Sequence, residues 1–206
     1  MTNYTLRKGN PATTKTDAVV IAVGRGPKGD AEVAPGGEAV VDAYGRNFRP
    51  MLSAAGFNGN TGETLRVPTA GVLRAANLVL VGIGDLDAVS PLQIQRAAGN
   101  ASRAIGAASS VALALPANAP DEVAAALSGF MAGSYQFTKV GKPASTSVAD
   151  LIVLSDSARR SDMTAAFESA RLIETLASRT RDWANMPPNL LTPEVFAKEG
   201  QAFVSQ

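Results

Sequence analysis

Short apolar runs alternate along the chain with stretches in which apolar positions recur every three or four residues. The β-branched runs at 17–23, 77–83 and 149–154, with shorter segments at 63–68 and 111–115, predict strands. The segments that open at Ser90, at Pro120 and at Ser161 have helical periodicity. Strands that alternate with helices predict an α/β domain with a largely parallel or mixed sheet flanked by helices.

The starts of two helices are marked by their capping residues. Ser90 suits the N-cap position, and Pro91 loses no hydrogen bond in the first turn of a helix. Pro120 is followed by Asp121 and Glu122, and acids in a first turn are favoured by the helix dipole. We therefore expect helices to begin at both places.

The N-terminal third is less informative. Residues 25–62 are rich in glycine and include Pro27, Pro35 and Pro50. Within them, the apolar residues at 39–41 and the basic stretch at 46–49 are compatible with either a helix or a hairpin. Residues 1–17 are polar and basic, and we assign no element to them.

The segment 161–182 predicts the longest helix, on the order of 30 Å. Its expected inner face is marked by residues at i, i+3 and i+4 spacing: Met163, Ala166, Phe167, Ala170, Ile173, Ala177 and Thr180. This helix would span a small domain.

A proline-rich segment, 183–193 (WANMPPNLLTP), follows that helix. Pro187 and Pro188 should end the helix and stiffen an extended connector. Thr192, Pro193 and Glu194 then predict a helix start. The new helix carries apolar residues at helical spacing: Val195, Phe196, Ala202 and Phe203.

Two interpretations of this C-terminal region stay open. It is either the entry into a second domain or a helix that folds back on the first domain. The first interpretation divides the chain into an N-terminal α/β domain at 1–158, a linker helix with its connector at 159–191, and the start of a further domain at 192–206.

Composition then narrows the chemistry. The 206 residues are 46% hydrophobic and 18% charged, with a net charge of +1 and neither Cys nor His. This excludes disulfides, thiol nucleophiles, Cys/His metal sites and Ser-His-Asp catalysis within the chain. The small net charge makes a nucleic-acid partner unexpected. No apolar run is long enough to cross a membrane, and no secretion signal is evident, so a cytoplasmic location is expected.

Two loops are candidate ligand sites. Residues 24–29 (GRGPKG) match G-x-G-x-x-G, but the prolines and glycines that follow favour a plain loop. A phosphate held there near Arg25 or Lys28 remains the alternative. Asp85 and Asp87 could bind a metal at the end of a strand, although solvated turn residues are the more ordinary interpretation.

The remaining candidates have structural interpretations. Arg159 and Arg160 predict a solvated pair, and Tyr135 and Phe137 predict residues that pack or lie at a domain boundary. Trp183 predicts an interdomain packing residue. Residues 186–193 could serve as a polyproline ligand, but a rigid linker is favoured.

Residues 181–193 (RDWANMPPNLLTP) closely resemble the linker of leucyl (cytosol) aminopeptidases, which reads R-D-L-x-N-x-P-P-N-x-L-T-P. Residues 129–139 (GFMAGSYQFTK) resemble the family's G-x-x-L-G-x-Y-x-F segment, with Ala132 at the usual Leu position. Residues 80–84 and the helix with Arg96 are similar to a strand–helix unit of that family. The resemblance extends from about residue 77 to the end of the chain.

The resemblance implies a macro-domain-like N-terminal domain of a two-domain enzyme that removes N-terminal residues from peptides. It also implies two divalent metal ions, manganese or zinc, in a catalytic domain, and a homo-hexamer. The family's motifs V-G-K-G-x-x-F-D-S-G-G and N-T-D-A-E-G-R do not occur here. We therefore assign no catalytic, cofactor or metal residue to this chain and expect it to be inert alone. The alternative is a freestanding macro-like module that binds a nucleotide, ADP-ribose or nucleic acid.

Overall fold

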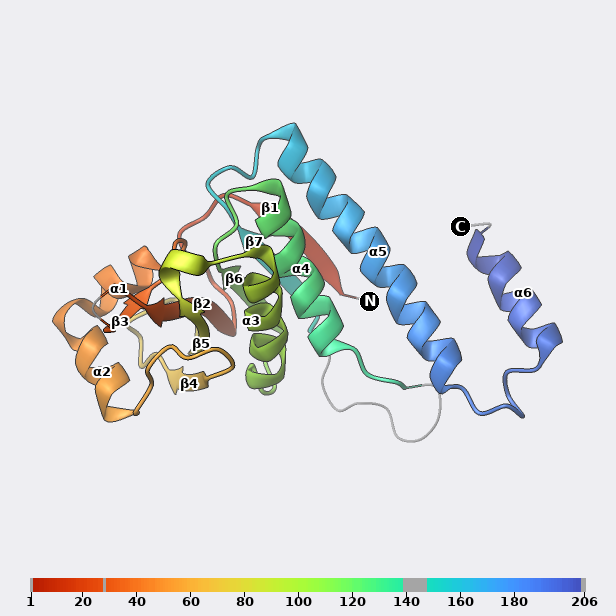
Figure 1. Cartoon of the computed structure of the whole chain (residues 1–206), viewed down its shortest axis with the longest axis horizontal. Helices are drawn as coiled ribbons and strands as arrows, with labels where there is room; N and C mark the ends of the chain where they lie inside the picture. The colour runs from red at the N-terminus through yellow and green to blue at the C-terminus, as the bar shows by residue number, and fades with distance from the viewer. Residues whose placement is uncertain (1, 28, 139–147, 205–206) are drawn as a thin grey trace.

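The computed structural model describes residues 2–27, 29–138 and 148–204. A central sheet carries helices on both faces, and a long helix leads away from it to a final helix (Figure 1). The strands are β1 (Asn3–Arg7), β2 (Ala18–Arg25), β3 (Ala31–Val33), β4 (Thr64–Pro68), β5 (Asn77–Asp85), β6 (Ser110–Ala114) and β7 (Asp150–Leu154). The helices are α1 (Glu38–Tyr44), α2 (Phe48–Ala54), α3 (Pro91–Ala104), α4 (Pro120–Ser134), α5 (Ser161–Asn185) and α6 (Pro193–Val204), with short 3-10 turns η1 (Gly45–Asn47) and η2 (Leu86–Ala88).

The sheet is mixed, as the sequence predicts. Its strand order is β1-β7-β6-β2-β5-β4, and β3 pairs with the end of β2. The pairs β1–β7, β7–β6, β6–β2 and β2–β5 are parallel, whereas β3 and β4 run antiparallel to their neighbours. The predicted α/β class with helices around a mixed sheet is confirmed.

The central strand β2 separates two apolar cores. Its residues alternate between the faces, because successive side chains of a strand point to opposite sides. Ala18, Val20 and Ala22 face the core covered by α3, α4 and α5. Val19, Ile21 and Val23 face the core covered by α1 and α2. Both faces are therefore closed, and this explains the uninterrupted apolar run of β2.

Helices α3 and α4 meet at backbone distance. A Cβ atom added to Gly129 of α4 would lie 2.0 Å from the carbonyl oxygen of Gln95 in α3, so only glycine fits there. The alanines of α3, among them Ala97, Ala98 and Ala101, fill the same layer. Small residues thus set the close packing of this helix pair.

Two strands lie where the sequence analysis assigned none. β1 contributes only Tyr4 and Leu6 to the core, since it is an edge strand with one covered face. β3 has only three residues. Such short runs give almost no periodic signal. The region left open at 39–49 is helical, with Pro50 in the first turn of α2, where its missing N–H costs nothing.

The expected inner face of α5 is correct in its first half and wrong in its second. Met163, Phe167 and Ala170 are buried against the sheet layer, but Ile173 is 60% exposed. Glu174 takes the buried position instead. The helix also continues to Asn185, three residues beyond the predicted end.

The connector after α5 is a turn, not an extended segment. Met186 is extended, as expected before a proline, but the carbonyl of Pro187 then accepts hydrogen bonds from the N–H groups of Leu190 and Leu191 at 2.9 and 3.0 Å. Pro188 fixes φ at the position after the acceptor, which favours a turn. Thr192 caps α6 as predicted: its Oγ1 accepts from Val195 N at 3.4 Å.

Among the helices of the described residues, none is long and apolar enough to span a membrane.

Candidate interdomain interface

The second half of α5, the connector and α6 form what we call the C-terminal arm, residues 172–204. The sheet body is the sheet with α1–α4 and the first half of α5. In Figure 1 the arm extends beyond the sheet, with α6 beside the second half of α5 and antiparallel to it.

A polar cluster joins the arm to the body on the inner side of α5. Glu174 is only 8% exposed, and its carboxylate lies 3.8 Å from the Nη1 atom of Arg181. The guanidinium of Arg181 lies 5.6 Å from the ring centroid of Tyr135, which follows α4. The Tyr135 hydroxyl donates a hydrogen bond to Asp182 at 3.0 Å. We call these four residues the inner network.

Burial of the Glu174 carboxylate in the inner network is electrostatically unfavourable. Burial raises the pKa of the Glu174 carboxyl, and the nearby Arg181 charge opposes this only in part. Glu174 Oε2 and Arg181 Nη1 are buried without a hydrogen-bond partner in the described structure. Because the Arg181 side chain is 40% exposed, an ion pair at this separation gives little net stability.

The outer side of the same helix segment is apolar and exposed. Leu172, Ile173 and Leu176 are 57%, 60% and 40% exposed, and we call them the outer stripe. Leu172 and Glu174 are two residues apart, about 200° around the helix, so they lie on opposite faces. Three large apolar residues grouped on one exposed helix face are typical of an interaction surface.

Helix α6 packs against the end of α5 through side chains. The rings of Trp183 and Phe196 meet edge to face with centroids 4.9 Å apart. The indole Nε1 of Trp183 donates to Glu199 at 2.7 Å. Arg179 lies 3.8 Å from Glu199 and stands over the ring of Phe203 at 5.7 Å. Trp183 is thus a packing residue between two helices.

Both aromatic residues of α6 have a contact: Phe196 with Trp183 and Phe203 with Arg179. Their contacts are with the arm's own α5, and no backbone hydrogen bond joins α6 to a strand among the described residues. Phe196 remains 48% exposed, and Leu190 of the connector 47%.

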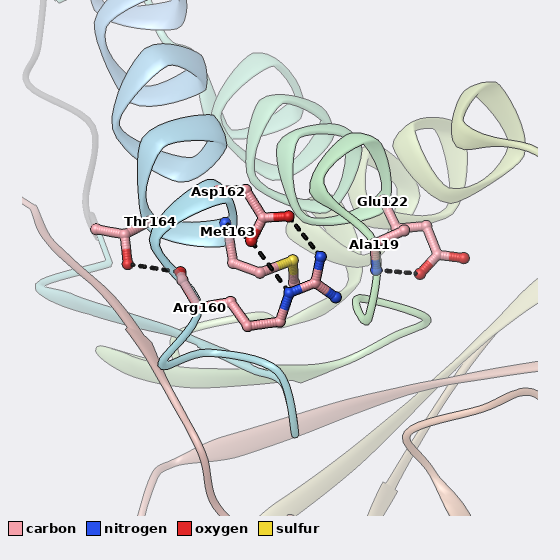
Figure 2. Close-up of polar contacts among 6 residues, drawn as sticks. All are labelled: Ala119, Glu122, Arg160, Asp162, Met163 and Thr164. Carbon is pink, nitrogen blue, oxygen red and sulfur yellow. Dashed lines mark hydrogen bonds and ion pairs between the residues drawn. The ribbon is translucent and has the colours of Figure 1, made fainter.

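Tyr135 packs on α5, in line with one of its two predicted roles, and Phe137 is half-buried. Of the arginine pair, Arg160 is engaged: its Nε donates to Asp162 at 3.1 Å (Figure 2). The same view shows the start of α4, where Glu122 accepts from Ala119 N at 3.0 Å. The Arg160 side chain is more than half exposed, so the ion pair of Arg160 and Asp162 is solvated and lies at the start of α5.

In the glycine-rich segment, Gly24 and Arg25 are the last residues of β2 and pair with Glu32 and Ala31 of β3, so the two strands form a hairpin. The N–H of Gly26 donates to Asp30 and that of Gly29 to Gly26, and no helix begins there. Gly24 lies against the carbonyl of Gly84 and the side chain of Leu86, so the protein's own chain fills the adjacent space. The loop interpretation is correct, and Lys28 lies outside the described residues.

Asp85 is a capping residue. Its carboxylate accepts from the N–H of Asp87 at 3.1 Å, at the start of η2. Within the described ranges no three Asp or Glu side chains come together as a metal site.

A cleft of about 460 Å³ lies at the carboxyl ends of β1, β6 and β7. Its charged side chains are one ammonium, Lys8, and three carboxylates, those of Glu38, Asp42 and Asp156. Lys8 is paired with Asp156 at 3.2 Å, and Glu38 accepts from the N–H of Gly36. An excess of carboxylates disfavours a diphosphate, so this edge does not support the nucleotide-binding alternative.

Sequence reasoning missed the inner network and the outer stripe. Glu174 and Arg181 are seven residues apart, about two turns of the helix, and both lie on the side of α5 that the predicted apolar face occupies. Charged residues on that side indicate a polar partner there. Leu172 and Leu176 form a second apolar line, which the single-face interpretation overlooked.

Comparison with known proteins now assigns the family. Residues 19–143 match the model of the cytosol aminopeptidase family, N-terminal domain. The chain is 33% identical to a probable cytosol aminopeptidase of Streptomyces griseus, over 96% of this chain and 42% of the relative, and 32% identical to one of Streptomyces coelicolor, over 98% and 43%. The chain therefore belongs to the cytosol aminopeptidase family and corresponds to its N-terminal domain. It spans less than half the length of these relatives.

Solved structures agree on the fold. A mutant of tomato leucine aminopeptidase superposes on the whole chain with a TM-score of 0.79 at 17% identity, using 42% of its own length. The bottromycin maturation enzyme BotP, solved in complex with Mn, matches 90% of the chain with a TM-score of 0.65 at 22% identity. At these identities the likeness concerns the fold alone.

Proposed function

We propose that this chain is the non-catalytic N-terminal domain of an aminopeptidase that removes N-terminal residues from peptides. The family match carries the proposal, together with the length of the relatives, of which the chain spans 42% in the first example. The catalytic residues and two divalent ions, manganese or zinc, would belong to the remainder of the polypeptide.

The residue inventory supports this division of labour. The chain has neither His nor Cys, and the two family motifs named above do not occur in it. Chemistry in a longer polypeptide would then depend on residues beyond 206. The role left to this domain is structural: shaping access to the catalytic site and helping to assemble a homo-hexamer in the cytoplasm.

The test compares two polypeptides in a leucine-p-nitroanilide assay, with Mn²⁺ or Zn²⁺ added and after chelation. We expect the polypeptide extended past residue 206 to release the nitroaniline only with metal, and the 206-residue chain to release none. A metal-independent extended polypeptide, or an active 206-residue chain, would contradict the proposal.

Assembly is tested on the same samples. Light scattering should give a mass of six subunits for the extended polypeptide. A monomer that retains full activity would remove the proposed role of this domain in assembly.

A further inference from the structure

We infer that the outer stripe of α5 is the surface on which the polypeptide following residue 206 docks. The inference rests on the proposed function, because it requires the catalytic domain to continue this chain. It commits to an occupant in the same polypeptide, as opposed to a second copy.

The first argument is the direction of α6. Phe196, near its start, contacts Trp183 at the end of α5, whereas Phe203, near its end, contacts Arg179. α6 therefore runs back along α5 towards the outer stripe. Figure 1 shows α6 antiparallel to α5. From Arg179 to Leu172 is seven residues of helix, on the order of 10 Å. A polypeptide that continued in the direction of α6 would therefore approach the outer stripe.

The second argument is continuity of the apolar surface. Leu172, Leu176 and Trp183 lie within about 40° of one another around α5, so they share one side of the helix. α6 covers the Trp183 end of this side and leaves the Leu172 end open. Ile173 extends the open part on one flank.

The third argument is that the inner side of α5 already attaches this helix to the sheet body. Met163, Phe167 and Ala170 attach α5 to the body, and the inner network attaches its second half. The outer stripe is therefore not needed for packing within the described residues. Exposed leucine and isoleucine on one face are stabilised only when a further surface removes them from water.

The chain contains no cysteine, so single substitutions give clean chemical probes. Leu172→Cys and Leu176→Cys report on the stripe. The matched control is Thr164→Cys, on the same helix, exposed, and outside the stripe. Each variant is made in the 206-residue chain and in the extended polypeptide, and maleimide labelling is followed at each peptide by mass spectrometry.

In the 206-residue chain we expect the stripe positions and the control to react at similar rates. In the extended polypeptide the stripe positions should react at least about tenfold more slowly, at every protein concentration, while the control is unchanged. Equal rates in both polypeptides would overturn the inference. Protection that grows with protein concentration would assign the surface to a second copy and would also overturn it.

The leucine-p-nitroanilide assay on the same samples separates the two proposals. An active, metal-dependent enzyme with a reactive stripe would leave the function standing and refute the docking surface. A protected stripe in an inactive extended polypeptide would support the docking surface and refute the proposed function.

Discussion

The two halves of α5 belong to one helix but have opposite surroundings. In the first half, Met163 and Phe167 point into the apolar core and the outer side is free of large apolar residues. In the second half a charged pair, Glu174 and Arg181, lies inside, and leucine and isoleucine lie outside. Apolar surface is normally buried and charge exposed, so the second half reverses the usual arrangement, which is the basis of the docking surface inferred above.

The comparison teaches that the sheet body is complete and the C-terminal arm is not. Both faces of the sheet are closed by helices, and the two strand-lined cores hold the fully buried side chains. The arm keeps its shape through a few side-chain contacts, among them Trp183 with Phe196. Four comparisons, which use five substitutions, test this difference, from the largest expected effect to the smallest.

The largest effect is expected in the body. Phe130 of α4 is fully buried, and Phe130→Ala should lower the free energy of unfolding by about 3–5 kcal/mol, because it removes a large side chain and leaves a cavity. Leu172→Ala, the matched change on the arm, should alter it by no more than about 0.5 kcal/mol. Urea denaturation of the 206-residue chain measures both, and equal losses would remove the distinction between body and arm.

A smaller effect is expected at the base of the sheet. The Asp17 carboxylate accepts from the N–H groups of Ser110 and Ser109 at 2.8 and 2.9 Å, and these bonds, that of Ser110 first, lower its pKa. Asp17→Asn should cost about 1 kcal/mol at neutral pH, since the side chain is exposed and screened.

The sign of the pH dependence follows from that lowered pKa. The stabilisation by Asp17 is present above its unfolded pKa of about 3.9 and is lost as the pH falls through the lower, folded value. The difference in free energy of unfolding between the wild-type protein and Asp17→Asn should therefore become smaller in acid. A difference that stays constant as the pH falls would show that the charge of the Asp17 carboxylate does not contribute to stability.

Glu174 should show the opposite pH dependence. Its pKa is raised, mainly by burial, so the folded state prefers the protonated form. Stability should fall as the pH rises from the unfolded pKa of glutamate through the folded value, and Glu174→Gln should abolish that fall. Parallel pH profiles of the two proteins would mean that Glu174 is solvated, contrary to the inner network described above.

The smallest global effect is expected from Trp183→Ala. It removes the aromatic contact and the hydrogen bond to Glu199 that hold α6. We expect faster amide exchange in α6 with a melting temperature of the body that is nearly unchanged, because α6 adds nothing to the sheet cores. A clear fall in melting temperature would show that α6 is part of the body.

The sequence predicts the body better than the arm for a physical reason. The strands at β2 and β5 are buried on both faces, so their continuous apolar runs identify them. β1 is missed because its single covered face needs only Tyr4 and Leu6. The resemblance of residues 181–193 points to the family from the sequence alone, and the family model confirms it over residues 19–143.

The arm is harder to predict because the contacts of its buried side are made by polar residues, which the spacing of apolar residues does not reveal. The spacing of Met163, Phe167 and Ala170 extends naturally to Ile173, but the helix buries Glu174 there instead. Tyr135, which follows α4 in the sequence, gives Arg181 a contact with a distant segment on that side. Such a contact between distant segments depends on the tertiary fold, and periodicity does not report it.

The division into a complete body and an incomplete arm is tested most directly by native-state amide exchange of the 206-residue chain. We predict that amides of β2, β5 and α4 exchange only through global unfolding, whereas those of α6 and the last turns of α5 exchange through local opening at a lower free energy. Uniform protection from α4 through α6 would contradict the account, because the arm would then be a finished part of the same folded unit.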